Sequence, residues 1–257
     1  MADQESVRSS VLQVLNKTNA INVKDVNFLH SMKPRPDIPL IQHNLCEDIT
    51  EELKSKLNSL YHETPTVFPA IDTSTLVSYR CQTFPLLYCV EITSSTPITR
   101  SVQETGKWLW NVTTTIRKNV INCVGYVDKK TPGPFDMTSV SSRRGGLQLL
   151  NTVSVFRRFD EGDQVVLVGT AKWYLPSAGL VLQDYNWTVI SPSTNPDYDC
   201  VARNYYKVEA TRVSPAKTEA QKTILDLVGN RMRIITQSMQ DTSLSLDERI
   251  SAEKSSA

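Results

Sequence analysis

The chain has 257 residues, a net charge of +1 and 40% hydrophobic residues, enough for one large domain with its own core or for one domain with an extension. Acidic and basic residues are interspersed, so the sequence lacks the strongly basic footprint that nucleic-acid binding usually needs. No apolar run is long enough to cross a membrane as a helix.

Two further features concern location. The N-terminal residues have neither the basic region nor the apolar core of a signal peptide. Five cysteines, an odd number with no CxxC pair, fit a reducing compartment with free thiols. We therefore expect a cytoplasmic protein.

Residues 1–47 are predicted to be an N-terminal extension or linker. The run Lys33–Pro39 contains three prolines and favours an extended chain. A proline-rich docking peptide for a partner is the alternative for this segment. The main domain is predicted over residues 48–242, and its first helix over about Glu51–Tyr61, with Asp48 or Thr50 as the cap.

The next elements are two strands, a helix and two more strands. The strands are expected at Leu76–Gln82, Leu86–Thr93, Val120–Val127 and Phe135–Ser142. Ser94–Pro97 is expected to end the second strand. The helix is expected at Ser101–Lys118, because Ser101 and Glu104 have the spacing of a capping box.

Four consecutive strands follow, each with apolar residues at every second position, which is the pattern of a half-buried antiparallel strand. Their expected bounds are Leu147–Phe159, Gln164–Leu175, Leu180–Ile190 and Cys200–Arg212. Gly162 supplies the turn after the first of them. We expect the inward residues of all four strands to form one apolar face.

A long amphipathic helix is predicted from Ser214–Pro215 to about Gln240, with apolar residues at three- and four-residue spacing on one stripe. This helix can cover the apolar face of the sheet. Residues 243–257 are expected to be a disordered tail. The order of elements gives an α+β fold class.

Several short stretches resemble the START-like proteins abundant in oomycetes, including those labelled mating-specific. The stretches are Leu60–Phe68, Ser94–Ile98 with the following Trp108-Leu109-Trp110, Phe156–Val168 and Asn186–Val189. The resemblance covers roughly residues 50–242. It implies a START-like helix-grip fold, in which a curved antiparallel sheet wraps around a long C-terminal helix over a hydrophobic cavity. The N-terminus shows no sustained heptads, so no DNA-binding or zipper role is carried over from relatives.

The sequence offers no catalytic or metal site. The three histidines all precede the predicted four strands, and none has a metal-ligand spacing. We find no inward Asp, Glu or His on the four strands, and the resembling family supplies no catalytic motif. The chain is therefore not expected to be an enzyme or to need a cofactor.

Polar residues on the apolar faces point instead to ligand binding. Asn151, Arg157, Gln183 and Asn204 are in phase with apolar neighbours, and an unpaired polar group in a dry core costs about 1–3 kcal/mol. A wet or ligand-filled cavity would accept them. Three alternatives remain open: Arg157 reaches solvent at the strand end, bulges shift the phase, or the polar groups satisfy one another. The candidate ligand-binding residues are Asn151, Arg157, Trp173, Gln183, Tyr185, Asn204, Tyr206, Val228, Met232 and Ile235.

The expected function is binding of a lipid or other hydrophobic small molecule in a cavity between sheet and C-terminal helix. The alternative is a regulatory or protein-interaction module with a START-like fold and no ligand. The first function leaves room for peripheral membrane contact. Neither involves nucleic acid, and the sequence names no protein partner.

Overall fold

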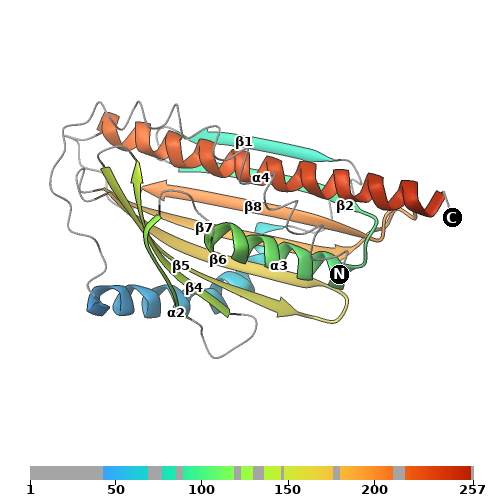
Figure 1. Cartoon of the computed structure of the whole chain (residues 1–257), viewed down its shortest axis with the longest axis horizontal. Coiled ribbons are helices and arrows are strands. Elements are labelled where there is room, and N and C mark those ends of the chain that lie inside the picture. Colours follow the sequence, from blue (N-terminus) through green and yellow to red (C-terminus); the bar gives the residue numbers. More distant parts are fainter. Residues whose placement is uncertain are drawn as a thin grey trace.

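The computed structural model describes residues 43–68, 77–84, 89–118, 123–129, 136–145, 148–175, 180–210 and 218–255. Within these residues, eight antiparallel strands form one sheet in the order β1-β2-β8-β7-β6-β5-β4-β3 (Figure 1). The strands are β1 (Ser78–Phe84), β2 (Cys89–Ile98), β3 (Cys123–Lys129), β4 (Asp136–Gly145), β5 (Gln148–Asp160), β6 (Val165–Leu175), β7 (Leu180–Pro192) and β8 (Cys200–Ala210).

In the described part of the chain, three helices cover the two faces of this sheet. They are α2 (His43–Val67), α3 (Val102–Lys118) and α4 (Thr218–Ser255). Helix α2 packs on β5, β6 and β7, while α3 and α4 pack on the opposite face (Figure 1). The long α4 lies along β2 and β8. An α+β fold with an antiparallel sheet and a long C-terminal helix packed on it was predicted, and this fold class is confirmed.

Both faces of the central strands are buried, which explains their composition. Val165, Val166, Leu167 and Val168 are four consecutive buried residues of β6. Successive side chains of a strand point to opposite faces, so Val166 and Val168 pack under α2, while Val165 and Leu167 pack under α3. A strand covered on both sides needs apolar residues in both phases.

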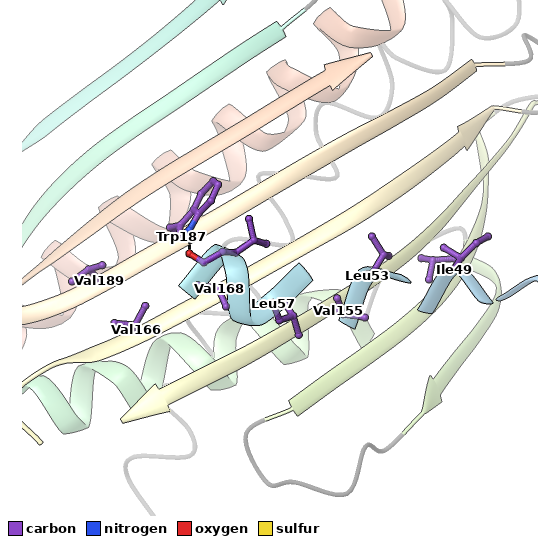
Figure 2. Close-up of a cluster of buried hydrophobic side chains, with 10 residues drawn as sticks. Ile49, Leu53, Leu57, Val155, Val166, Val168, Trp187 and Val189 are labelled. Atoms are coloured by element: carbon purple, nitrogen blue, oxygen red, sulfur yellow. Dashed lines mark hydrogen bonds between the residues drawn. The ribbon is translucent and has the colours of Figure 1, made fainter. Parts of the chain in front are cut away.

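The face under α2 is an apolar cluster built from one stripe of the helix (Figure 2). Leu53 and Leu57 are almost fully buried against Val155 and Val168. Trp187 donates a hydrogen bond from Nε1 to the carbonyl oxygen of Leu60 at 2.8 Å. Each fully buried leucine or valine side chain of this cluster contributes roughly 1.5–3 kcal/mol to folding. This cluster therefore fixes α2 on the sheet.

The opposite face carries two clusters. Trp108, Leu109 and Val112 of α3 pack over β6, β7 and β8. Leu225 and Val228 of α4 pack over β2 and β6 to β8. Helix α4 approaches β2 closely, because a Cβ atom added at Gly229 would lie 3.0 Å from the side chain of Val90.

The local signals for α3 and for the β5–β6 turn are confirmed. Ser101 Oγ accepts a hydrogen bond from the Glu104 backbone at 3.3 Å, and the Glu104 carboxylate accepts one from the Ser101 backbone at 3.2 Å. Gly162 has a φ angle of 77°, which glycine adopts without strain.

Four expected boundaries are wrong. Helix α2 begins at His43 rather than near Glu51 and continues through Pro65 to Val67. Strand β2 does not end at Ser94, because residues 94–98 pair with β8 and Pro97 lies opposite Val201. The segment from residue 243 is not a disordered tail, since α4 continues to Ser255 and Ser243 is buried. The Ser214–Pro215 helix start and the proline-rich run Lys33–Pro39 lie outside the described residues.

The expectation of a single shared apolar face is also wrong. Directly paired residues of antiparallel strands point to the same side. Trp173 pairs with Leu182, and Lys172 pairs with Gln183. The predicted inward residues of β6 and β8 therefore face α3 and α4, whereas those of β5 and β7 face α2.

Candidate ligand-binding site

The structure divides the candidate residues between the two faces. Trp173 and Tyr206 belong to the apolar cluster under α4, together with Val228 and Met232 of the helix itself. Ile235 is half-buried on the same stripe of α4, three residues beyond Met232. Asn204 points to this face as well, two residues before Tyr206. These residues lie between the sheet and α4, where the site was expected.

The other four candidates point away from α4. Arg157 pairs with Val168, and Gln183 and Tyr185 pair with Lys172 and Thr170, all on the face under α2. Asn151 pairs with Tyr174 on that face too. One shared site for all the candidates is therefore ruled out by the strand register.

A buried carboxylate that the sequence analysis missed lies at the centre of the α4 face. Asp184 is 1% exposed, and its Oδ2 accepts hydrogen bonds from Trp173 Nε1 at 2.7 Å and from Tyr206 OH at 3.1 Å. The prediction that the four strands hold no inward acid is wrong. The available signal was the phase of Asp184, which matches that of Leu182, buried under α4, and of Ile190, buried under α3 on the same side of the sheet.

A polar row crosses the sheet next to this group. Thr188 donates from Oγ1 to Asn204 Oδ1 at 2.6 Å, and Asn204 donates from Nδ2 to Ser94 Oγ at 3.2 Å. The row joins β7, β8 and β2 between the cluster under α4 and the cluster under α3. Asn204 is therefore satisfied by Thr188 and Ser94 rather than by the other candidate polar residues.

A buried hydroxyl on β5 adds to the polar lining. Thr152 lies opposite Trp173 in the strand register, so its side chain points to the α4 face. The residue is 4% exposed, and within the described part of the chain Oγ1 has no hydrogen-bond partner. Buried hydroxyls are nearly always hydrogen-bonded, so this one calls for a partner.

Arg157 is held by protein groups on the face under α2. Its Nε and Nη2 donate to the two carboxylate oxygens of Asp136 at 2.6 and 3.2 Å, and its Nη1 donates to Asn58 Oδ1 at 3.0 Å. The guanidinium also lies 5.9 Å from the ring centroid of Phe159. Arg157 thus ties β5 to β4 and α2.

Gln183 and Tyr185 line a groove beside α2, with a volume of about 470 Å³. This groove and the α4 face are on opposite sides of the sheet. Among the described residues, no group of His, Cys, Asp and Glu side chains could hold a metal ion, and no helix is long and apolar enough to cross a membrane.

No family model matches this chain, and no curated protein matches it. Similar solved structures include human STARD10, with 13% identity and a TM-score of 0.43 over 79% of this chain and 84% of that one. The human StarD13 (DLC2) lipid transfer and protein localization domain has 11% identity and a TM-score of 0.38 over 72% and 96%. A STAR-related lipid transfer protein from Xanthomonas axonopodis has 12% identity and a TM-score of 0.39 over 66% and 97%.

These similarities do not test the resemblance to the oomycete START-like family, which stays a prediction. At such low identities and TM-scores we infer function from this chain's own side chains.

Proposed function

We propose that this protein binds a lipid or another hydrophobic small molecule in a cavity between the sheet and α4, without catalysing a reaction. The observation that carries the proposal is the buried Asp184 carboxylate, which accepts hydrogen bonds from Trp173 and Tyr206 beside the apolar cluster under α4. In the same proposal the protein is cytoplasmic, meets membranes only peripherally and does not bind nucleic acid. The balance of acidic and basic residues supports the absence of nucleic-acid binding, and the odd number of cysteines without a CxxC pair supports the cytoplasmic location.

The mixed lining suits a ligand with an apolar body and one polar end. Small-molecule sites are mostly apolar, with a few placed polar groups that fix the orientation. Val90, Ile92, Val208 and Val228 supply apolar surface on the α4 face. Asp184 and the Thr152 hydroxyl supply polar positions beside that surface. A ligand hydroxyl or amide near Thr152 would provide the partner that its Oγ1 lacks among the described residues.

Native mass spectrometry of the full-length protein, followed by organic extraction, tests this proposal. We expect a co-purifying hydrophobic molecule, or uptake of a fluorescent sterol or diacylglycerol from phosphatidylcholine vesicles. Asp184→Asn should weaken uptake by about tenfold, because a hydrogen bond to a charged group contributes roughly 1.5–3 kcal/mol. Asp241→Asn, on an exposed part of α4, is the matched control. A wild-type protein that neither carries nor takes up these molecules would contradict the proposal.

A second candidate function is a regulatory or interaction module with a filled core. One observation favours it: the Phe156 ring covers Gly169, and a Cβ atom there would overlap the ring. Side-chain packing therefore already fills this part of the α4 face. Absence of uptake together with a cooperative thermal transition would favour this function over the first.

A further inference from the structure

The groove beside α2 is a separate feature from the proposed ligand cavity, because it lies across the sheet from α4. We call it the α2 groove, and it is lined by Glu52, Lys56, Lys172, Tyr174, Val181, Gln183 and Tyr185. Its volume of about 470 Å³ falls within the range of small-molecule sites, which is roughly 300–1,000 Å³. The groove can therefore hold a compact organic molecule.

Two ammonium groups meet at one carboxylate in the α2 groove. Lys172 Nζ lies 2.7 and 2.5 Å from the two oxygens of Glu52, and Lys56 Nζ lies 3.0 Å from Oε1. Within this three-residue cluster, two positive charges and one negative charge leave one net positive charge. The hydrogen bond from Lys172, followed by the one from Lys56, lowers the pKa of Glu52, so its carboxylate stays ionised at neutral pH.

The two lysines differ in how firmly they are placed. The Lys172 side chain is 18% exposed and projects from β6, in the middle of the sheet, opposite Gln183. The Lys56 side chain is 38% exposed and lies on the surface of α2. Lys172 is therefore a fixed cation in the wall of the groove, and Lys56 is a second cation that can adjust its position.

The rest of the lining is aromatic and neutral. Tyr174 and Tyr185 supply ring surface, and Val181 supplies apolar surface. Burial raises the pKa of Tyr185, so its hydroxyl remains a neutral donor at neutral pH. The amide of Gln183 is fixed by its hydrogen bond to Thr170 Oγ1 at 2.6 Å. These surfaces fit an uncharged ring or short chain attached to an anionic group.

We propose that the α2 groove is a second binding site, for a carboxylate or phosphate group on a compact organic molecule. Lys172 and Lys56 bind the anion, and Glu52 is the internal anion with which the ligand competes. Charge-assisted hydrogen bonds from lysine to carboxylate or phosphate are about twice as strong as neutral ones. The anion can come from a free metabolite-sized acid or from the headgroup of a lipid, since both present the same chemistry.

Titration calorimetry of the full-length protein with phenyl phosphate tests the site, and vesicle sedimentation separates the two sources. The vesicles are phosphatidylcholine with and without phosphatidic acid. We expect Lys172→Gln to weaken phenyl phosphate binding by about tenfold or more, because it removes hydrogen bonds to a charged group. Glu52→Gln should strengthen binding by a similar factor, because it removes the competing carboxylate. If the protein sediments only with vesicles that contain phosphatidic acid, and the variants show the same pattern, the lipid headgroup is the source of the anion.

Lys54→Gln is the matched control. Lys54 is on the same helix and forms an exposed ion pair with Glu51 at 2.8 Å, outside the groove lining. This variant should bind within about twofold of wild type, since surface pairs contribute little. Lys56→Gln provides a second loss-of-binding variant on the helix surface if Lys172→Gln fails to fold.

Three results would overturn the site. The first is that neither wild type nor Glu52→Gln binds phenyl phosphate or the phosphatidic-acid vesicles. The second is an equal loss of phenyl phosphate affinity in Lys54→Gln and Lys172→Gln, and the third is a lower affinity in Glu52→Gln than in wild type. Failure of this second site can be distinguished from failure of the proposed hydrophobic-ligand site. Asp184→Asn should leave phenyl phosphate binding unchanged, and Lys172→Gln should leave uptake of the hydrophobic probe unchanged, because the two residues face opposite sides of the sheet.

Discussion

Replacing Arg157 by Met tests whether this residue is a structural cross-link or part of a ligand cavity. In the structure its guanidinium is paired with both oxygens of Asp136 and with Asn58. Met keeps an unbranched apolar stem but lacks the guanidinium, so the variant mainly removes the charge and its hydrogen bonds. The variant also leaves the Asp136 carboxylate without this partner.

The expected loss of stability lies between two limits. Exposed ion pairs contribute about 0–1 kcal/mol, whereas breaking a fully buried pair costs about 3–5 kcal/mol. The Arg157 and Asp136 side chains are 28% and 23% exposed, and the contact is bidentate. We therefore expect Arg157→Met to lower the free energy of unfolding by about 2 kcal/mol, of which about 0.5 kcal/mol reflects the contact with the Phe159 ring. For a chain of this size the shift in Tm is roughly 4–8 °C.

Urea unfolding followed by tryptophan fluorescence measures the loss, and a double-mutant cycle with Asp136→Asn measures the pairwise coupling. We expect a coupling of about 1 kcal/mol or more, since the two side chains are in direct contact. Arg80→Met, at an exposed arginine of β1, is the control and should change stability by less than about 0.5 kcal/mol. A near-neutral Arg157→Met with no coupling to Asp136, accompanied by loss of a bound ligand, would refute the structural role and favour the cavity lining expected from the sequence.

Two further outcomes are expected from the packing and from a pKa shift. Gly169→Ala should lower the free energy of unfolding by about 1–3 kcal/mol, because the added Cβ overlaps the Phe156 ring, and Phe156→Leu in the same chain should restore part of the loss in urea unfolding. Burial raises the pKa of Cys89 from 9.0 to about 11, so the unfolded chain loses this proton at lower pH than the folded one, and stability should fall between pH 9 and 11. In pH-dependent urea unfolding that fall should be shallower in Cys89→Ala, and an identical slope in both proteins would contradict the shift.

Local signals in the sequence were enough to locate most of the elements. Strands β5 to β8 lie within two residues of their expected bounds, because alternation and turn residues mark them independently of the rest of the fold. The capping box placed the start of α3 to within one residue. The start of α2 was missed because its first turn carries no Asp or Glu that would mark a helix N-terminus.

The candidate site was only partly predictable, because alternation shows which residues share a face and not which face of the sheet that is. With helices on both sides, the two faces look alike in sequence. The one local sign was the continuous apolar run Val165–Val168, which is typical of a strand buried on both sides. Trp173 and Tyr206 pack under α4, whereas Gln183 and Tyr185 belong to an equally apolar phase that packs under α2.

Strand β7 shows why polar residues must be sought in both phases of such a strand. Gln183 shares its phase with Trp187, whose side chain packs under α2, so it stood out as a polar residue on an apolar face. Asp184 is the next residue and shares the phase of Leu182 under α4. Because Asn186 and Thr188 are in the same phase of β7, the sequence pattern indicated that this phase faces solvent. The two residues meet through Thr170, whose hydroxyl accepts from Gln183 and donates to the Asp184 carbonyl oxygen at 2.7 Å. Strand β7 thus supplies Gln183 to the α2 groove and Asp184 to the face under α4. Because Thr170 contacts both residues, a variant at either position should be assayed both with the hydrophobic probe and with phenyl phosphate.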